Sequence, residues 1–131
     1  MSERLDKVRE LPLHIYLGAE EITTELGNGR IRAIVNKNAV NPAGMLHGGT
    51  LYTLSDVCAY VGLLSILTSE QEAVTHDIHV SVMRPARLHD EVIYTSRLVK
   101  MGKSLCFIDV KAESKDQVIA TARVTKSIVN L

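Results

Sequence analysis

The sequence predicts an α+β domain in which a curved antiparallel sheet packs around one long central helix. The first observation behind this prediction is the stretch 50–69, which contains a single charged residue, Asp56. Its apolar residues fall on nearly every face of a helix, as in a buried helix. The second is the alternation of apolar and polar residues in two segments before this stretch and four after it. The third is that the last four segments have short connections, which favour antiparallel pairing. One apolar helix is available to cover the apolar face of the sheet.

Taken in order, the chain begins with a short helix over residues 1–12, with Ser2 as a candidate N-cap and Pro12 as its end. Gly27-Asn28-Gly29 predicts a hairpin turn, because Asn and Gly accept a positive φ. Strands are predicted over residues 18–26, 30–36, 74–82, 91–100, 106–112 and 118–125. No linker or repeat interrupts the pattern, so residues 1–131 are expected to form a single domain.

Composition narrows the classes of function. The 15 basic residues balance the 15 acidic ones, and the only aromatic residues are four Tyr and one Phe. Neither fact favours nucleic acid or an anionic membrane as a partner. The two cysteines, Cys58 and Cys106, are isolated, and the first ten residues lack the apolar core of a signal peptide. We therefore expect a reduced, cytoplasmic protein, and a buried core helix rather than a membrane span over residues 50–69.

The loop before the central helix and Asp56 together suggest a site. Gly48 and Gly49 are placed where the backbone N–H groups of a helix N-terminus lack partners, and they let a ligand approach the backbone closely. Such a site suits a carbonyl oxygen that becomes an oxyanion. The amide of Asn41 can reach the same ligand. Asp56 would supply a carboxylate that activates water or attacks directly. A purely structural role for each of these residues is the alternative.

The spacing of the two halves predicts an oligomer. Eight helical residues separate Gly48 from Asp56, which is a rise of about 12 Å. Reacting atoms must come within about 3–3.5 Å of each other. If both residues act on one substrate, Gly48 must therefore serve the Asp56 of a neighbouring chain. Two antiparallel helices across a two-fold axis would give a homodimer with two equivalent shared sites.

The pattern Asn41-x5-His47-Gly48-Gly49-x4-Leu54-x-Asp56 resembles the signature of hotdog-fold acyl-CoA thioesterases of the phenylacetic-acid-degradation (PaaI) type. The similarity extends over roughly residues 15–130, through Asp77-Ile78-His79, Arg84-Pro85-Ala86 and Lys100-Met101-Gly102-Lys103. The resemblance implies a cytoplasmic thioester hydrolase that cleaves acyl-CoA to free acid and CoA. It also implies a dimer as the minimal active unit, pairing of dimers into a homotetramer, and no cofactor beyond the CoA of the substrate.

The resemblance also implies roles for individual residues. Asp56 matches the catalytic carboxylate, acting as general base or nucleophile. The Gly48 N–H matches the oxyanion donor, and the next residue, Gly49, is expected to bind substrate. Asn41 matches the residue that orients the thioester or the water. His47 matches a helix-start residue with a structural or positioning role. The expected substrate-binding residues are Thr75, which helps to hold the water, Gly102, Lys103 and Ser104 along the CoA arm, and Arg84 and Arg87 near the CoA phosphates.

Two other classes of function remain open. A hotdog-fold hydratase or dehydratase would resemble a different pattern with a His-Phe-Pro loop, which is absent here. A non-catalytic acyl-CoA sensor would resemble regulators that carry a DNA-binding helical domain, for which the residues ahead of the first predicted strand are too few. Assays of thioester hydrolysis against enoyl-CoA hydration, and of binding without turnover, would separate these hypotheses.

Several other residues have weaker functional readings. His76 and His79 are expected on opposite faces of a strand, which argues against a shared metal. Cys58 follows Asp56 by two residues and so lies on another face of the helix. His14 and His89 are expected to face solvent. Residues considered for an acyl pocket, with core packing as the alternative, are Tyr52, Tyr60 and Leu63.

Overall fold

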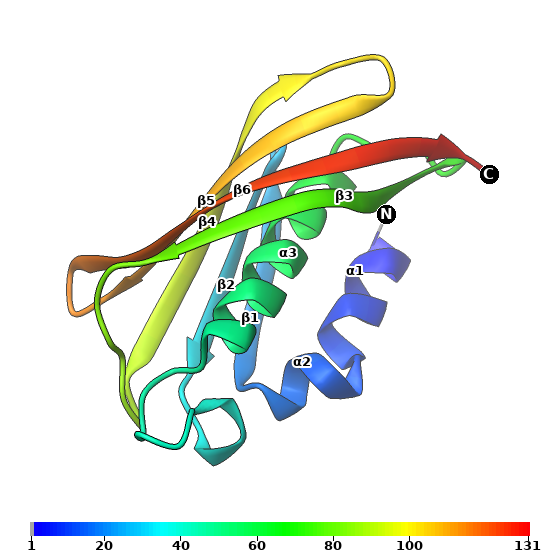
Figure 1. Cartoon of the computed structure of the whole chain (residues 1–131). Helices are drawn as coiled ribbons and strands as arrows, with labels where there is room; N and C mark the ends of the chain where they lie inside the picture. Colours follow the sequence, from blue (N-terminus) through cyan, green and yellow to red (C-terminus); the bar gives the residue numbers. More distant parts are fainter. Residues whose placement is uncertain (1) are drawn as a thin grey trace.

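The structure is a computed structural model that describes residues 2–131, so Met1 and the side chain of Ser2, the candidate N-cap, lie outside the described part. Three α-helices and one 3₁₀ helix accompany six strands (Figure 1). The helices are α1 (Ser2–Glu10), α2 (Pro12–Tyr16), η1 (Lys37–Ala39) and α3 (Gly48–Leu64). The strands are β1 (Ala19–Glu25), β2 (Asn28–Ile34), β3 (Gln71–Val82), β4 (Glu91–Met101), β5 (Leu105–Ser114) and β6 (Gln117–Asn130).

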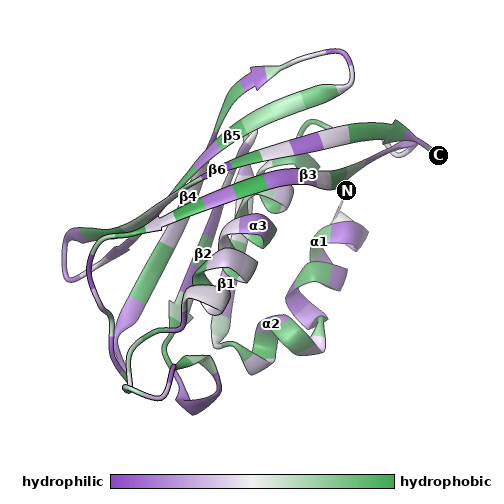
Figure 2. Cartoon of the chain, viewed as in Figure 1, coloured by the Kyte–Doolittle hydropathy of each residue, from purple (hydrophilic) through white to green (hydrophobic). Residues whose placement is uncertain are grey.

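All six strands form one antiparallel sheet in the order β1-β2-β4-β5-β6-β3, which curves around α3 (Figure 1). The predicted fold class is therefore confirmed. The inner side chains of the sheet and of α3 make the core, in which Leu51, Leu54 and Ile108 are almost fully buried. In Figure 2 apolar and polar bands alternate along α1, and its apolar residues Leu5 and Val8 are buried. Within residues 2–131 no helix is both long and apolar enough to cross a membrane.

The first hairpin turns one residue earlier than the sequence suggests. Leu26 and Gly27 occupy the turn, both with positive φ, and Glu25 pairs with Asn28. Gly29 lies in β2 instead, where an added Cβ would collide with the carbonyl oxygen of Cys58 in α3. The glycine is therefore needed for close approach of helix and strand rather than for the turn.

Strand β3 contains a β-bulge that the period-two pattern does not reveal. The pairing with β6 shifts between Thr75 and Asp77, so that His76 has no partner residue. Side chains on the two sides of the bulge therefore change faces. The expected single apolar face from Val74 to Val82 is wrong, because Val74 is exposed and Thr75 points towards α3.

The two edges of the sheet differ. At the β1 edge, the guanidinium of Arg9 in α1 donates two hydrogen bonds to the carbonyl oxygen of Ile22, at 3.0 and 2.8 Å. At the other edge, β3 is twelve residues long and pairs with β6 on one side only. A long edge strand of this kind is a template for pairing with another strand.

Candidate active site

The single carboxylate of α3, that of Asp56, forms a hydrogen-bonded group with two other side chains. Asp56 Oδ1 accepts a hydrogen bond of 2.7 Å from the Thr75 hydroxyl and one of 2.8 Å from Lys126 Nζ. Lys126 also donates to Thr75 Oγ1 at 2.9 Å. Within residues 3–131 Asp56 Oδ2 makes no hydrogen bond, and 28% of the Asp56 side chain remains exposed. Oδ2 is therefore the oxygen free to act on a ligand.

Sequence reasoning missed Lys126, although the pattern held a signal for it. Ala120, Ala122 and Val124 alternate on the inner face of β6, and the same alternation places Lys126 on that face. A lysine at an inner position, opposite a helix with one carboxylate, indicates a buried ion pair. Its side chain is 4% exposed.

A cavity of about 510 Å³ adjoins this group, between α3, the ends of the sheet and the N-terminal helices. Asp56, Val57, Tyr60, Glu72 and Lys126 line it on one side. The N-terminal helices supply the other wall, with Arg4, Lys7, Val8, Leu11 and His14. A cavity that combines apolar and charged side chains beside a carboxylate with one free oxygen can hold the non-reacting part of a substrate.

His14 corrects an expectation, because it is buried rather than facing solvent. Its Nδ1 lies 2.7 Å from the carbonyl oxygen of Val8 and so carries the proton in the neutral ring. Pro12 starts the second helix and turns His14 inward, which the isolated sequence does not indicate. His89 is exposed, as expected.

Of the three residues considered for an acyl pocket, only Tyr60 lines the cavity. Leu63 is fully buried in the core, and Tyr52 is exposed on α3. Burial, with a smaller contribution from the adjacent Glu72, raises the pKa of Tyr60 to about 12. The Tyr60 hydroxyl is therefore protonated at neutral pH and cannot serve as a base.

The N-terminus of α3 offers one free backbone donor. His47 is the N-cap, and its Nδ1 accepts a hydrogen bond of 2.8 Å from the Gly49 N–H. Within the described residues the Gly48 N–H makes no hydrogen bond. A Cβ on Gly49 would crowd the His47 ring at 3.1 Å, whereas one on Gly48 would meet nothing within 4 Å. The cap thus accounts for a glycine at position 49. At Gly48 the backbone N–H is without a partner among the described residues.

Asn41 shapes the loop in front of the helix. Its Oδ1 accepts hydrogen bonds from the backbone N–H groups of Ala43, at 2.9 Å, and Met45, at 3.1 Å. These bonds fix the orientation of the amide, so that Nδ2 is its free end and can donate to an oxygen of a ligand.

The remaining predicted residues lie at two ends of the molecule. The loop between β3 and β4, which carries Arg84 and Arg87, joins the loop before α3 through the Met45–Arg87 bridge and lies near the N-terminus of α3 (Figure 1). The turn between β4 and β5, with Gly102, Lys103 and Ser104, lies towards the C-terminal end of α3 (Figure 1). Within one chain, then, Thr75 and Asp56 are brought together, and Gly48 and the Gly102 turn are not.

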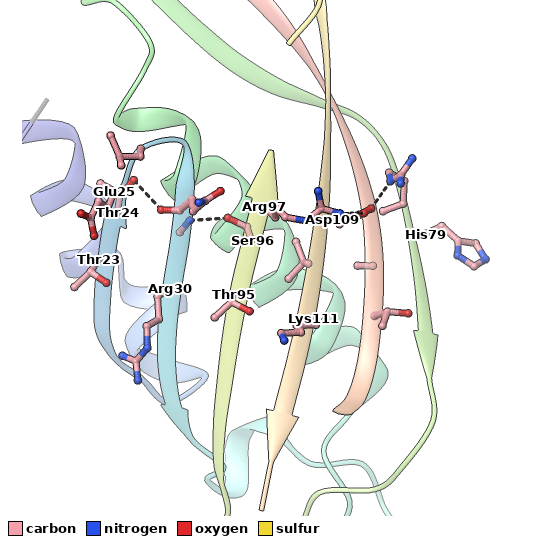
Figure 3. A pocket seen from close by; sticks show the side chains of 17 residues that line it. Thr23, Thr24, Glu25, Arg30, His79, Thr95, Ser96, Arg97, Asp109 and Lys111 are labelled. Atoms are coloured by element: carbon pink, nitrogen blue, oxygen red, sulfur yellow. Dashed lines mark hydrogen bonds and ion pairs between the residues drawn. The ribbon is translucent and has the colours of Figure 1, made fainter. Parts of the chain in front are cut away.

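A larger hollow, of about 1070 Å³, lies on the outer face of the sheet and contains none of the predicted site residues (Figure 3). Three of its charged side chains pair with one another: Asp109 accepts from Arg97 at 3.1 Å and from Arg123 at 2.5 Å. His79 points to this outer face. The carboxylate with a free oxygen lies on the opposite side of the sheet, so we place the candidate site there.

The described residues around Asp56 provide neither a reactive cysteine nor a group of metal ligands. Cys58 is fully buried, and burial raises the pKa of its thiol to about 12, so it is protonated and unreactive. Residues 2–131 hold no cluster of three or more His, Cys, Asp or Glu side chains arranged for a metal ion.

Comparison with known proteins identifies the family and the fold. Residues 43–126 match the Thioesterase superfamily. The chain is 32% identical over 100 residues to human acyl-coenzyme A thioesterase 13, covering 73% of this chain and 69% of that protein.

Two solved structures illustrate the fold. The PaaI protein from the phenylacetic acid degradation operon of Escherichia coli has a TM-score of 0.85 at 18% identity, covering 98% of this chain and 91% of that one. A Streptococcus mutans protein bound to acetyl-CoA has a TM-score of 0.76 at 23% identity, covering 85% and 90%. The chain therefore belongs to the thioesterase superfamily and is a thioester hydrolase with the hotdog fold.

Proposed function

We propose that this protein hydrolyses acyl-CoA thioesters to free acid and CoA. The observation that carries the proposal is the Asp56 carboxylate, whose Oδ1 is held by Thr75 and Lys126 while Oδ2 stays free beside a cavity. Two comparisons support CoA as the carrier, namely the human acyl-coenzyme A thioesterase 13 and the S. mutans protein bound to acetyl-CoA.

In the proposed reaction, a water oxygen attacks the thioester carbonyl carbon and one water proton passes to Asp56 Oδ2. The carbonyl π electrons move to its oxygen, which the Gly48 N–H stabilises with help from Asn41 Nδ2. Collapse of this intermediate breaks the C–S bond, and the CoA thiolate takes the proton. His47 keeps Gly49 in place, so that the free amide of Gly48 points outward.

Asp56 can also act as the nucleophile: Oδ2 attacks the thioester carbonyl carbon, the C–S bond breaks and CoA leaves as the thiolate, and water then attacks Asp56 Cγ of the resulting anhydride to release the acid. A single turnover in H₂¹⁸O separates the two routes. General-base catalysis places ¹⁸O in the product acid, whereas nucleophilic attack first places it in Asp56.

We propose that the two halves of the site meet across a homodimer. Gly48 and Asp56 are separated by a helical rise of about 12 Å in α3, too far for one carbonyl. Antiparallel pairing of two protomers brings the Gly48 end of one α3 to the Asp56 and Gly102-turn end of the other.

Exposed features at one side of the molecule support this assembly. Strand β3 has a bare edge of twelve residues. Exposed apolar side chains continue along it and the adjoining elements, at Val74, Val82, Met83 and Tyr52. Pairing of two β3 edges would extend the sheet and cover these side chains.

The CoA arm is proposed to run along the turn Gly102, Lys103 and Ser104, with Arg84 near its phosphates. The positive charge of Lys103 and Arg84, both exposed, suits these phosphates. A cytoplasmic location, assembly of two dimers into a homotetramer, and catalysis without a cofactor remain predictions from the family resemblance.

One assay tests the proposal directly. Aryl, short, medium and long acyl-CoA substrates are supplied to the purified protein, and released thiol is measured beside hydration of an enoyl-CoA. We expect thiol release from at least one acyl class and no hydration. Hydration without thiol release, or tight binding of acyl-CoA without turnover, would instead favour the hydratase or the sensor.

The acyl group is proposed to occupy the cavity beside Asp56, which leads to a prediction about chain length. Leu11→Trp should fill part of the cavity and lower kcat/KM for long acyl chains by about 10-fold, because the lost apolar contacts are worth about 1–3 kcal/mol. Acetyl-CoA should be affected little. Leu13→Trp is the matched control, since Leu13 is similarly exposed and does not line the cavity. Equal effects of the two variants on long chains would place the acyl group elsewhere.

A further inference from the structure

We propose that Lys126 is a positioning residue for Asp56, which fixes the orientation of the carboxylate and presents Oδ2 to the substrate. The inference rests on the proposed function and deepens it. It is carried by the geometry of Lys126, Thr75 and Asp56, and the family pattern described above gives Lys126 no role.

The direction of every hydrogen bond in the group follows from its donors. A lysine ammonium only donates, so Thr75 Oγ1 must accept the 2.9 Å hydrogen bond from Lys126. The single hydroxyl proton of Thr75 is then available for Asp56 Oδ1, at 2.7 Å. Lys126 Nζ also lies 5.7 Å from the centroid of the Tyr60 ring, within cation–π range. Oδ1 thus receives two donors, and turning the carboxylate out of this position breaks both hydrogen bonds.

The burial of Lys126 makes its pairing with Asp56 necessary. The Lys126 side chain is 4% exposed, and Asp56 is its one salt-bridge partner among the described residues. A buried ammonium without a counter-charge is costly, so the folded protein keeps Lys126 and the Asp56 carboxylate together. The exposed pair Arg97–Asp109 on the outer face has no such constraint, because solvent competes for both charges.

The backbone also fixes the two partners of Asp56. Thr75 and Lys126 are directly opposite residues of β3 and β6, and the bulge at His76 follows immediately. Both side chains therefore project from the same face of the sheet towards α3. The donors come from rigid strands rather than loops, as an orienting group requires.

The effect of Lys126 on the reaction is expected in kcat rather than KM. Lys126 contacts the carboxylate and not the thioester, and a misplaced reacting group costs up to about 10²-fold in rate. We expect Lys126→Met to lower kcat by about 10- to 100-fold with little change in KM. Lys126→Arg should restore part of the loss by returning the charge. Lys111→Met is the matched control, because Lys111 is an exposed residue of β5 outside the site.

The split between kcat and KM separates positioning from a structural role. A misplaced carboxylate lowers kcat in a protein that remains folded, and Lys126→Arg, which returns a donor to Asp56, should restore part of the loss. A purely structural role would instead show as lower stability in urea unfolding with an unchanged kcat per folded molecule.

One further readout does not depend on turnover. The ¹³C resonance of the Asp56 carboxyl carbon, assigned with Asp56→Asn, should shift in Lys126→Met and stay in place in Lys111→Met, because only the first variant loses a hydrogen-bond donor to Oδ1. An unchanged kcat and an unchanged carboxyl resonance in a folded Lys126→Met would overturn the inference. Absence of acyl-CoA hydrolysis by the wild-type protein would overturn the proposed function instead, while the carboxyl resonance still decides the role of Lys126.

Discussion

Replacing Asp56 by Asn is expected to lower kcat for acyl-CoA hydrolysis by about 10²–10⁴-fold, the usual contribution of a general base. The amide keeps the size of the side chain but can neither take a proton from water nor attack the thioester. Released thiol, measured at saturating substrate, gives kcat directly. A rate within a few-fold of wild type would remove Asp56 from the mechanism.

The same substitution affects folding, because it removes the counter-charge of Lys126. Breaking a buried pair by removing one partner costs about 3–5 kcal/mol as a rule. The exposure of 28% of the Asp56 side chain should reduce this cost through solvent screening. The double variant Asp56→Asn/Lys126→Met removes both charges and should regain stability in urea unfolding without regaining activity. Recovery of activity together with stability would show that the loss in the single variant was one of folding.

The sheet and the central helix were predictable because their residues carry a local signal, whereas α2 and η1 were not predicted. The period-two alternation identified six strands, and the apolar stretch around Asp56 identified the central helix. The errors came from tertiary contacts. The turn at Leu26-Gly27 moved because Gly29 is needed where β2 approaches α3, and the bulge at His76 broke the alternation along β3.

The candidate site was predictable to the same extent. Asp56 and Gly48 stood out because a carboxylate in an apolar helix and a helix-start glycine are each unusual in their surroundings. The partners of Asp56 depend on which strands become neighbours, because Thr75 and Lys126 are 51 residues apart and meet only through the pairing of β3 with β6. The burial of His14 depends likewise on how the N-terminal helices dock.

Replacing Gly48 by Pro should lower kcat by about 10²–10³-fold, the usual effect of losing one oxyanion donor. The substitution removes only the backbone N–H that is proposed to hold the oxyanion. Gly48 is the first residue of α3, a position that Pro favours, and His47 has φ −67° and ψ 136°, which Pro requires of the residue before it. Gly48→Ala keeps the N–H and meets nothing within 4 Å in the protomer, so it is the matched control.

The two inactive variants together test the shared site. If Gly48 of one chain serves Asp56 of the other, a mixed dimer of Gly48→Pro and Asp56→Asn chains has one site with both defects and one site with neither. Random pairing then restores about one quarter of wild-type activity, since half of the dimers are mixed and each has one intact site of two. If each chain used its own Gly48 and Asp56, every site in the mixture would carry one defect. Activity that stays at the level of the separate variants after refolding them together would therefore place the whole site within one chain.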